Sequence, residues 1–241
     1  MKIIRTSDYA EMCRKAAGII SAEVIMKPDC TLGLATGDSP LGVYELLAEW
    51  HRLRYLDFSE VTAFNLDEYR GIAPAAVQSY KFFMWENLFS KINIKPENLF
   101  IPNGTAADPE AECAGYEAEI NKRGGIDLQL LGIGHNGHIG FNEPGDEFAG
   151  DTHVVDLSDS TIDANSRFFK ERGDVPVQAY TMGIRTIMKA RKIVLIVTGE
   201  KKAAIVKRSF FGGITPAVPA SILQLHGDFT LVGDEASLSQ V

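Results

Sequence analysis

One short segment, residues 131–145, concentrates the residue types that carry protons. It reads LGIGHNGHIGFNEPG and holds five glycines and two of the chain's five histidines. Glycines let the backbone approach a ligand closely, and a histidine oriented by a carboxylate is the usual proton carrier near neutral pH. His138 and Glu143 can form such a pair if the loop folds back on itself. A zinc site on His135 and His138 is the alternative, but it lacks the third ligand that completes common zinc sites, so we predict no metal.

A second candidate is the pair of adjacent carboxylates Asp67 and Glu68. The pair follows an apolar run that is expected to form a strand over 61–66. Crowding and removal from water can raise the pKa of one carboxyl toward neutrality, which suits a general base. The alternative interpretation is that Asp67 caps the N-terminus of a helix.

The sequence TGDSP at 36–40 could bind an anion. It combines a tight turn at Gly37 with hydroxyls at Thr36 and Ser39, and a helix is expected to start at once. Backbone N–H groups at such a helix start can cradle a phosphate. Asp38 opposes this interpretation, because a carboxylate beside a phosphate is repulsive unless its side chain turns away. The alternative is a simple helix cap.

Two cations could complete a phosphate site. Lys202 follows the strongest predicted strand in the sequence GEKK at 199–202, and Arg185 lies upstream in MGIR at 182–185. Lysine at a helix start is a sound phosphate ligand, and arginine can add a bidentate contact. Taken singly, each is ordinary surface charge. Taken with the turn at 36–40, they indicate a common anion site.

The elements that must position these segments alternate along the chain. Helical spacing and caps predict helices over 8–27, 40–52, 79–92, 109–123 and 158–170. Short apolar runs predict strands over 31–36, 61–66, 127–133, 152–157, 192–197 and 229–232. This alternation predicts an α/β fold with a mostly parallel, Rossmann-like open sheet and helices on both of its faces. Ligands of such sheets bind beyond the carboxyl ends of the strands.

Composition limits the partners. The 32 acidic residues exceed the 24 basic ones, and the formal charge of −8 disfavours nucleic acid as a partner. No apolar run is long enough to span a membrane and no targeting segment is visible, so we expect a cytoplasmic location. The three cysteines form no CxxC pair, which argues against a disulfide framework or a cysteine-rich zinc site. With no repeat or linker, we expect one domain over 1–241, with a candidate lid within 143–183.

Six motifs in this order resemble those of the glucosamine-6-phosphate deaminase family. They are LGLATGDSPLGVY at 32–44, FNLDEYRG at 64–71, LLGIGHNGHIGFNEPG at 130–145, YTMGIRTI at 180–187, GEKKA at 199–203 and VPASILQLH at 218–226. The resemblance implies conversion of glucosamine 6-phosphate and water to fructose 6-phosphate and ammonia without an organic cofactor. The segment GHIGFNEPG separates this family from the 6-phosphogluconolactonases, which share the fold.

The resemblance also implies roles for individual residues. Asp67 would be the base that moves a proton between C2 and C1 of the open-chain sugar, and His138 would open the pyranose ring. Glu143 would orient His138, while Asn136 stands where many relatives have Asp. The implied phosphate pocket comprises Thr36, Gly37, Asp38, Ser39, Arg185 and Lys202.

Two alternatives to the deaminase stay open on the sequence. One is a lactonase acting on 6-phosphogluconolactone, in which His138 activates water and Asp67 has no carbon acid to deprotonate. The other is a sugar-phosphate sensor without catalysis.

Larger members of the family are hexamers activated by N-acetylglucosamine 6-phosphate through basic residues after the FNEP loop. Here that stretch, GDEFAGDTHVVDL at 145–157, is acidic, so we expect no such activation and a monomer or small homo-oligomer.

Overall fold

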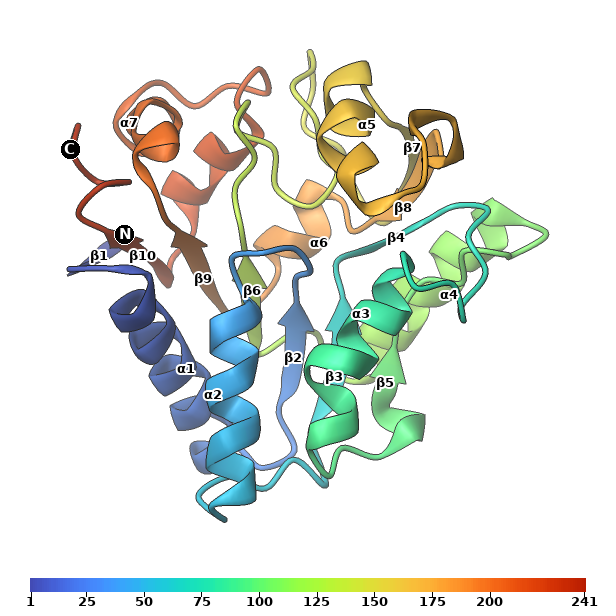
Figure 1. The fold of residues 1–241 in the computed structure, drawn as a ribbon, viewed down its shortest axis with the longest axis horizontal. Coiled ribbons are helices and arrows are strands. Elements are labelled where there is room, and N and C mark those ends of the chain that lie inside the picture. The colour runs from blue at the N-terminus through green and yellow to red at the C-terminus, as the bar shows by residue number, and fades with distance from the viewer.

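Seven strands form the main sheet of this computed structural model, which describes the backbone of residues 1–241 and all side chains except those of residues 160 and 164. Their order is β1-β10-β9-β6-β2-β3-β5, and every neighbouring pair is parallel. The strands are β1 Lys2–Thr6, β2 Thr31–Leu34, β3 Thr62–Asn65, β5 Leu99–Phe100, β6 Leu128–Leu131, β9 Lys192–Val197 and β10 Phe229–Asp234. The predicted α/β fold with a parallel open sheet is confirmed. Both chain ends lie at the β1–β10 side of the molecule (Figure 1).

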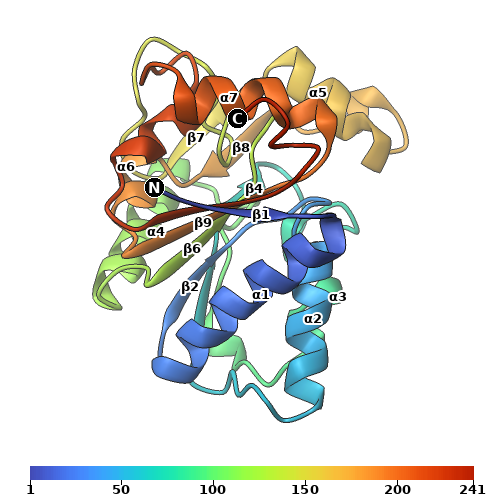
Figure 2. The same ribbon diagram turned by 90° about the vertical axis from the view of Figure 1, so that its left-hand side faces the viewer.

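Helices cover both faces of this sheet. One face carries α1 Tyr9–Met26, α2 Leu41–Arg52 and α3 Tyr80–Asn87; the other carries α4 Pro109–Lys122, α6 Ile184–Met188 and α7 Ala203–Phe211 (Figure 2). Short 3₁₀ turns are η1 Phe89–Lys91, η2 Pro96–Asn98, η3 Ser166–Phe168, η4 Arg172–Asp174, η5 Glu200–Lys202 and η6 Pro219–Leu225. No helix built from the described residues is both long and apolar enough to cross a membrane.

Local sequence explains where the helices begin. Asp108 accepts hydrogen bonds from the N–H groups of Glu110 and Ala111, and Pro109 occupies the first turn of α4, as the sequence predicts. The same helix is followed by Gly124, whose φ of 78° favours a residue without a side chain. Ser79 caps α3 by accepting from the N–H of Phe82 at 3.0 Å. These capped helices pack their apolar faces on the sheet and hold the strand ends in place.

A second, smaller sheet stands at the carboxyl ends of the main strands. Its antiparallel strands have the order β4-β8-β7, with β4 Asp67–Tyr69, β7 His153–Asp156 and β8 Gln178–Thr181. Helix α5, Asp159–Asn165, lies beside it (Figure 1). The strand expected over 152–157 therefore does not join the main sheet. An apolar cluster that includes Tyr69, Phe141 and Ile162 fills the space between the small sheet and α5.

The segment 143–183 contains two strands of the small sheet, β7 and β8, together with α5, η3 and η4. This segment is an ordered substructure over the strand ends, and its movement as a lid stays a prediction. The strand order of the main sheet reverses between β2 and β6: the chain builds outward through β3 and β5, then returns to β6 on the other side of β2. Loops that leave neighbouring strands in opposite directions open a crevice, so this point is the expected binding position.

Candidate active site

A cavity of about 910 Å³ lies at this reversal point. Four segments that are far apart in the sequence line it: the loop after β2, the start of β4, the loop after β6 and the turn after β9. Most predicted site residues are among its lining, namely Thr36, Gly37, Asp38, Ser39, Asp67, Asn136, His138 and Lys202. Glu143 lies directly behind His138, and Arg185 is elsewhere.

Asp67 is a buried acid with few interactions that stabilise its charged form. It is the first residue of β4, pairs in register with Thr181 of β8, and is 7% exposed. No described group donates a hydrogen bond to its carboxylate. Burial, together with the charge of Glu68, raises the pKa of Asp67 to about 8. A carboxylate of this kind is a far stronger base than an exposed one and can take a proton from carbon.

Glu68 points the other way and has a structural task. Its carboxylate accepts hydrogen bonds from the N–H groups of Tyr69 at 2.9 Å and of Tyr80 and Lys81 at 3.0 Å, the last two in the first turn of α3. Burial raises the pKa of Glu68, although these three N–H donors lower it. Successive side chains of a strand face opposite sides, so one carboxylate faces the cavity and its neighbour caps the helix.

The loop after β6 folds back as the sequence analysis requires. The N–H of Gly134 donates to the carbonyl of His138 at 2.9 Å, and Gly137 has a φ of 92°. The imidazole packs directly on Gly134: a Cβ atom there would lie 2.3 Å from the ring. His138 lines the cavity, and its Nδ1 lies 3.5 Å from Oε1 of Glu143. Glycine at 134 is therefore required by the position of His138.

Glu143 is held in the charged form. Burial alone would raise its pKa, but the interaction with His138 and hydrogen bonds from Thr161 and Asn136 lower it to about 2. The amide of Asn136 donates to Oε2 of Glu143 at 2.6 Å, and the hydroxyl of Thr161 donates to Oε1. The charged carboxylate, 3.5 Å from Nδ1 of His138, can fix the orientation of the ring.

Asn136 links two parts of the loop. Its Nδ2 donates to Glu143, and its Oδ1 accepts from the backbone N–H of His138 at 3.1 Å. An amide can make both bonds at once but cannot take up a proton. We interpret Asn136 as the residue that holds Glu143 in place beside His138.

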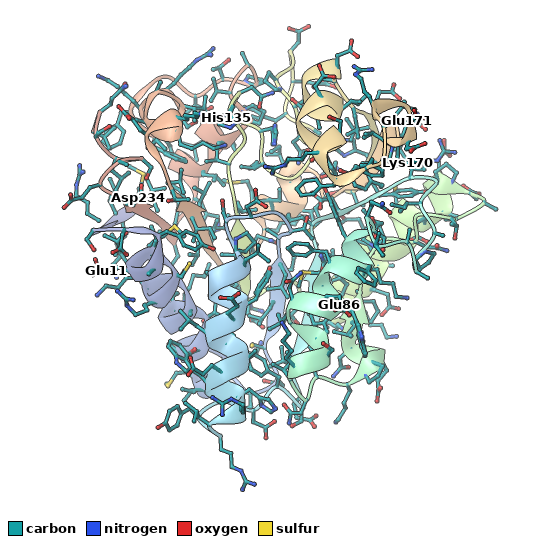
Figure 3. All side chains as sticks on the ribbon, in the orientation of Figure 1. Glu11, Glu86, His135, Lys170, Glu171 and Asp234 are labelled. Atoms are coloured by element: carbon teal, nitrogen blue, oxygen red, sulfur yellow. The ribbon has the colours of Figure 1, made fainter. Side chains whose placement is uncertain are left out.

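Lys202 supplies a cation to the lining of the cavity. Its ammonium donates to the carbonyl of Ile133 at 2.7 Å, and burial lowers its pKa to about 8. The turn that delivers it begins at Gly199, whose N–H lies 3.0 Å from a carboxylate oxygen of Asp234 at the end of β10 (Figure 3). His135, also labelled in Figure 3, lines the same cavity, and burial and the charge of Lys202 lower its pKa. An anion bound here would meet a partly desolvated positive charge.

The structure does not bring Arg185 to the cavity. Its guanidinium makes two 2.8 Å bonds to the carboxylate of Asp151 on the surface. The reason lies in α6, which buries Ile184, Thr186 and Ile187 and so leaves Arg185 on the outer side. An arginine that does line the cavity is Arg167, on η3.

Sequence reasoning missed several lining residues. Besides Arg167, they include Thr161 and an aromatic wall formed by Tyr80, Phe83, Phe168 and Phe169. The available signal was the sequence SRFF at 166–169, an arginine among aromatics at the end of the helix expected over 158–170. No cluster of three or more His, Cys, Asp or Glu side chains that could hold a metal ion occurs among the side chains the structure describes.

Comparison with known proteins identifies close relatives of this chain. The family model of glucosamine-6-phosphate isomerases/6-phosphogluconolactonase matches residues 7–231. The glucosamine-6-phosphate deaminase of Lachnoclostridium phytofermentans is 55% identical over 232 residues, which cover 96% of this chain and 98% of the relative. That of Clostridioides difficile is 52% identical over 241 residues, which cover 100% of this chain and 97% of the relative.

Solved structures point to the same family. A monomeric glucosamine-6-phosphate deaminase, 44% identical, superimposes with a TM-score of 0.97 over 100% of both chains. The 6-phosphogluconolactonase of Trypanosoma cruzi, 19% identical, reaches a TM-score of 0.80 over 100% of this chain and 96% of the other, a likeness of fold alone. The resemblance drawn from the six motifs is confirmed, and the chain belongs to the glucosamine-6-phosphate deaminase family.

Proposed function

We propose that this protein converts glucosamine 6-phosphate and water into fructose 6-phosphate and ammonia. The observation that carries the proposal is that Asp67 and His138 line one cavity together with the cations Lys202 and Arg167. A reaction that opens a sugar ring and then moves a proton between two carbons needs two separate proton carriers and a grip on the phosphate. The names of the relatives point to the same substrate.

The phosphate would bind at the end formed by residues 36–39 and Lys202. Gly37 has a φ of 101° and the next residues lead into α2, so backbone N–H groups can face an anion there. Arg167 takes the part that the sequence analysis gave to Arg185, because only Arg167 lines the cavity. Both cations can donate charge-assisted hydrogen bonds to phosphate oxygens.

Ring opening would fall to His138. Breaking the bond between C1 and the ring oxygen requires a proton on that oxygen and removal of the proton from the C1 hydroxyl. An imidazole can perform both transfers near neutral pH. Glu143, charged and 3.5 Å from Nδ1, would stabilise the imidazolium and leave the other ring nitrogen for the sugar.

Isomerisation and loss of ammonia would follow at Asp67. The carboxylate takes the proton from C2 of the open-chain aldehyde and a proton is returned to C1, which leaves an iminium at C2. Water adds to C2, and ammonia departs to give the ketose. Only proton carriers and water take part, so we propose that no organic cofactor is required. We further propose a cytoplasmic protein that acts as a monomer or small homo-oligomer, as the name of its solved relative suggests.

The test is a direct assay of both products. Purified protein incubated with glucosamine 6-phosphate should release ammonia and fructose 6-phosphate in equal amounts, measured by two independent coupled enzymes. Asp67→Asn should lose this activity. A folded protein that yields neither product would refute the deaminase. Hydrolysis of 6-phosphogluconolactone that is retained in Asp67→Asn would favour the lactonase. Binding of the sugar phosphate without any turnover would favour the sensor.

A further inference from the structure

An ion pair joins the two sides of the cavity at its phosphate end. The guanidinium of Arg167 lies 2.7 Å from Oδ2 of Asp38, and both residues line the cavity. Arg167 belongs to η3, at the end of the segment that carries α5, whereas Asp38 belongs to the loop between β2 and α2. The pair therefore connects the candidate lid with the predicted phosphate loop.

The backbone around Asp38 is fixed independently of this pair. The hydroxyl of Tyr9 on α1 donates to the Asp38 carbonyl at 3.3 Å and accepts from the N–H of Gly42 at 2.9 Å. The Asp38 side chain is 63% exposed and makes no other described hydrogen bond or ion pair. Its carboxylate is thus free to leave Arg167 without disturbing the loop.

Arg167 has one described anionic partner, which is Asp38. Its guanidinium also lies 4.5 Å from the ring centre of Phe168 and has 62% of its side chain exposed. A planar guanidinium binds a carboxylate and a phosphate through the same N–H groups. When a phosphate enters the cavity and binds Arg167, it repels the carboxylate of Asp38 and competes with it for the same N–H groups.

We propose that Asp38 is an internal competitor of the substrate's phosphate: it occupies Arg167 in the free protein and sets the affinity of the cavity for sugar phosphates. This inference rests on the phosphate position in the proposed function but not on turnover. An exposed ion pair is weak, so the competition is modest and reversible. The carboxylate would swing into solvent when the phosphate binds, and it would return when the product leaves.

The experiment measures binding of glucitol 6-phosphate, an acyclic sugar phosphate that cannot react, by isothermal titration calorimetry at low ionic strength. Asp38→Asn keeps the size of the side chain and removes its charge, and should lower Kd about three- to tenfold. In an Arg167→Met background the same substitution should change Kd less than about twofold, because the cation that Asp38 occupies is gone. Inorganic phosphate should show the same pattern at weaker affinity.

A matched control separates competition from a general loss of negative charge. Asp163 is 62% exposed, lies on α5 and pairs with Arg172 away from the cavity. Asp163→Asn should change Kd less than about twofold. Three outcomes would overturn the proposal. They are an unchanged or higher Kd in Asp38→Asn, an equal gain in affinity from Asp38→Asn in the Arg167→Met background, and no saturable binding by any variant. Because the probe is not turned over, failure of the deaminase assay would leave these outcomes readable.

Discussion

Asp67 should make the protein less stable than it would be with a neutral residue at the same place. Its pKa is raised from an ordinary 3.8 to about 8, chiefly by burial. The folded state therefore holds the proton more tightly than the unfolded state does. Stability from this group is complete below about pH 4 and is lost as the pH rises toward 8. Asp67→Asn removes the charge with almost no change in shape and should therefore stabilise the fold at neutral and alkaline pH.

The magnitude follows from the size of the shift. Each tenfold change in a protonation equilibrium corresponds to about 1.4 kcal/mol. A carboxyl whose pKa rises from 3.8 to about 8 thus loses at most about 5 to 6 kcal/mol of folding free energy above pH 8. The gain from Asp67→Asn should be about 1 to 2 kcal/mol at pH 5, should grow by at most about 1.4 kcal/mol per pH unit, and should level off above pH 8.

The assay is urea unfolding of both proteins at several pH values between 4 and 9, followed by circular dichroism. Glu68→Gln is the matched control, since that neighbouring carboxylate accepts three backbone hydrogen bonds. A glutamine amide offers only one acceptor oxygen, so Glu68→Gln should destabilise the protein by about 1 to 3 kcal/mol. A difference between wild type and Asp67→Asn that does not vary with pH would refute the reasoning about Asp67.

Three other predictions concern the remaining parts of the site. The pH profile of kcat/KM should be bell-shaped with a maximum near pH 8, since Asp67 must be ionised and Lys202, whose pKa burial lowers to about 8, must be protonated. Lys202→Arg should move the alkaline limb of the profile to higher pH. An unmoved limb would exclude Lys202 as its source. Arg167→Met should raise KM about tenfold or more, whereas Arg185→Met should leave it within about twofold; equal effects would contradict the placement of these two cations. Gly134→Ala should displace the ring of His138, lower kcat and cost about 1 to 3 kcal/mol in thermal unfolding, and a wild-type-like variant would show that the contact is not needed.

Five of the seven main-sheet strands were predictable from apolar runs, whereas β1, which reads KIIRT, and β5, which has two residues, were not predicted. A strand such as Lys192–Val197 is buried on both faces, and strands buried in this way have nearly continuous apolar sequences. The residues directly after such strands were predictable for the same reason: the strand ends place the loops at 36–39 and at 132–138 on one edge of the sheet.

The second sheet was less accessible to sequence analysis. Strand β4 has three residues, Asp67–Tyr69, and pairs with β8, more than a hundred positions away. No local pattern encodes such a pairing, because it depends on how the loop after β6 and the segment 143–183 pack. The orientation of Asp67 toward the cavity and of Glu68 away from it follows from that pairing and could not be obtained from their adjacency.

The choice between two arginines shows the same limit. Arg185 was a reasonable phosphate ligand on the sequence because arginine can make a bidentate contact with phosphate, but the buried face of α6 directs it to Asp151. Arg167 lies near the end of the helix expected over 158–170, far from the end of any predicted strand, and only the fold of α5 and η3 over the strand ends carries it to the cavity. Where a side chain of such a peripheral substructure points depends on tertiary packing, which the periodicity of the sequence does not report.

The most direct test of the account is whether Asp67 moves the proton between the two carbons of a sugar held in this cavity. Wild type incubated with glucosamine 6-phosphate in deuterium oxide should release ammonia and yield fructose 6-phosphate that carries deuterium at C1, detected by NMR. Asp67→Asn should slow this conversion about 10³-fold, while it binds glucitol 6-phosphate within about threefold of wild type. Ammonia release by Asp67→Asn at a rate close to that of wild type would contradict the account.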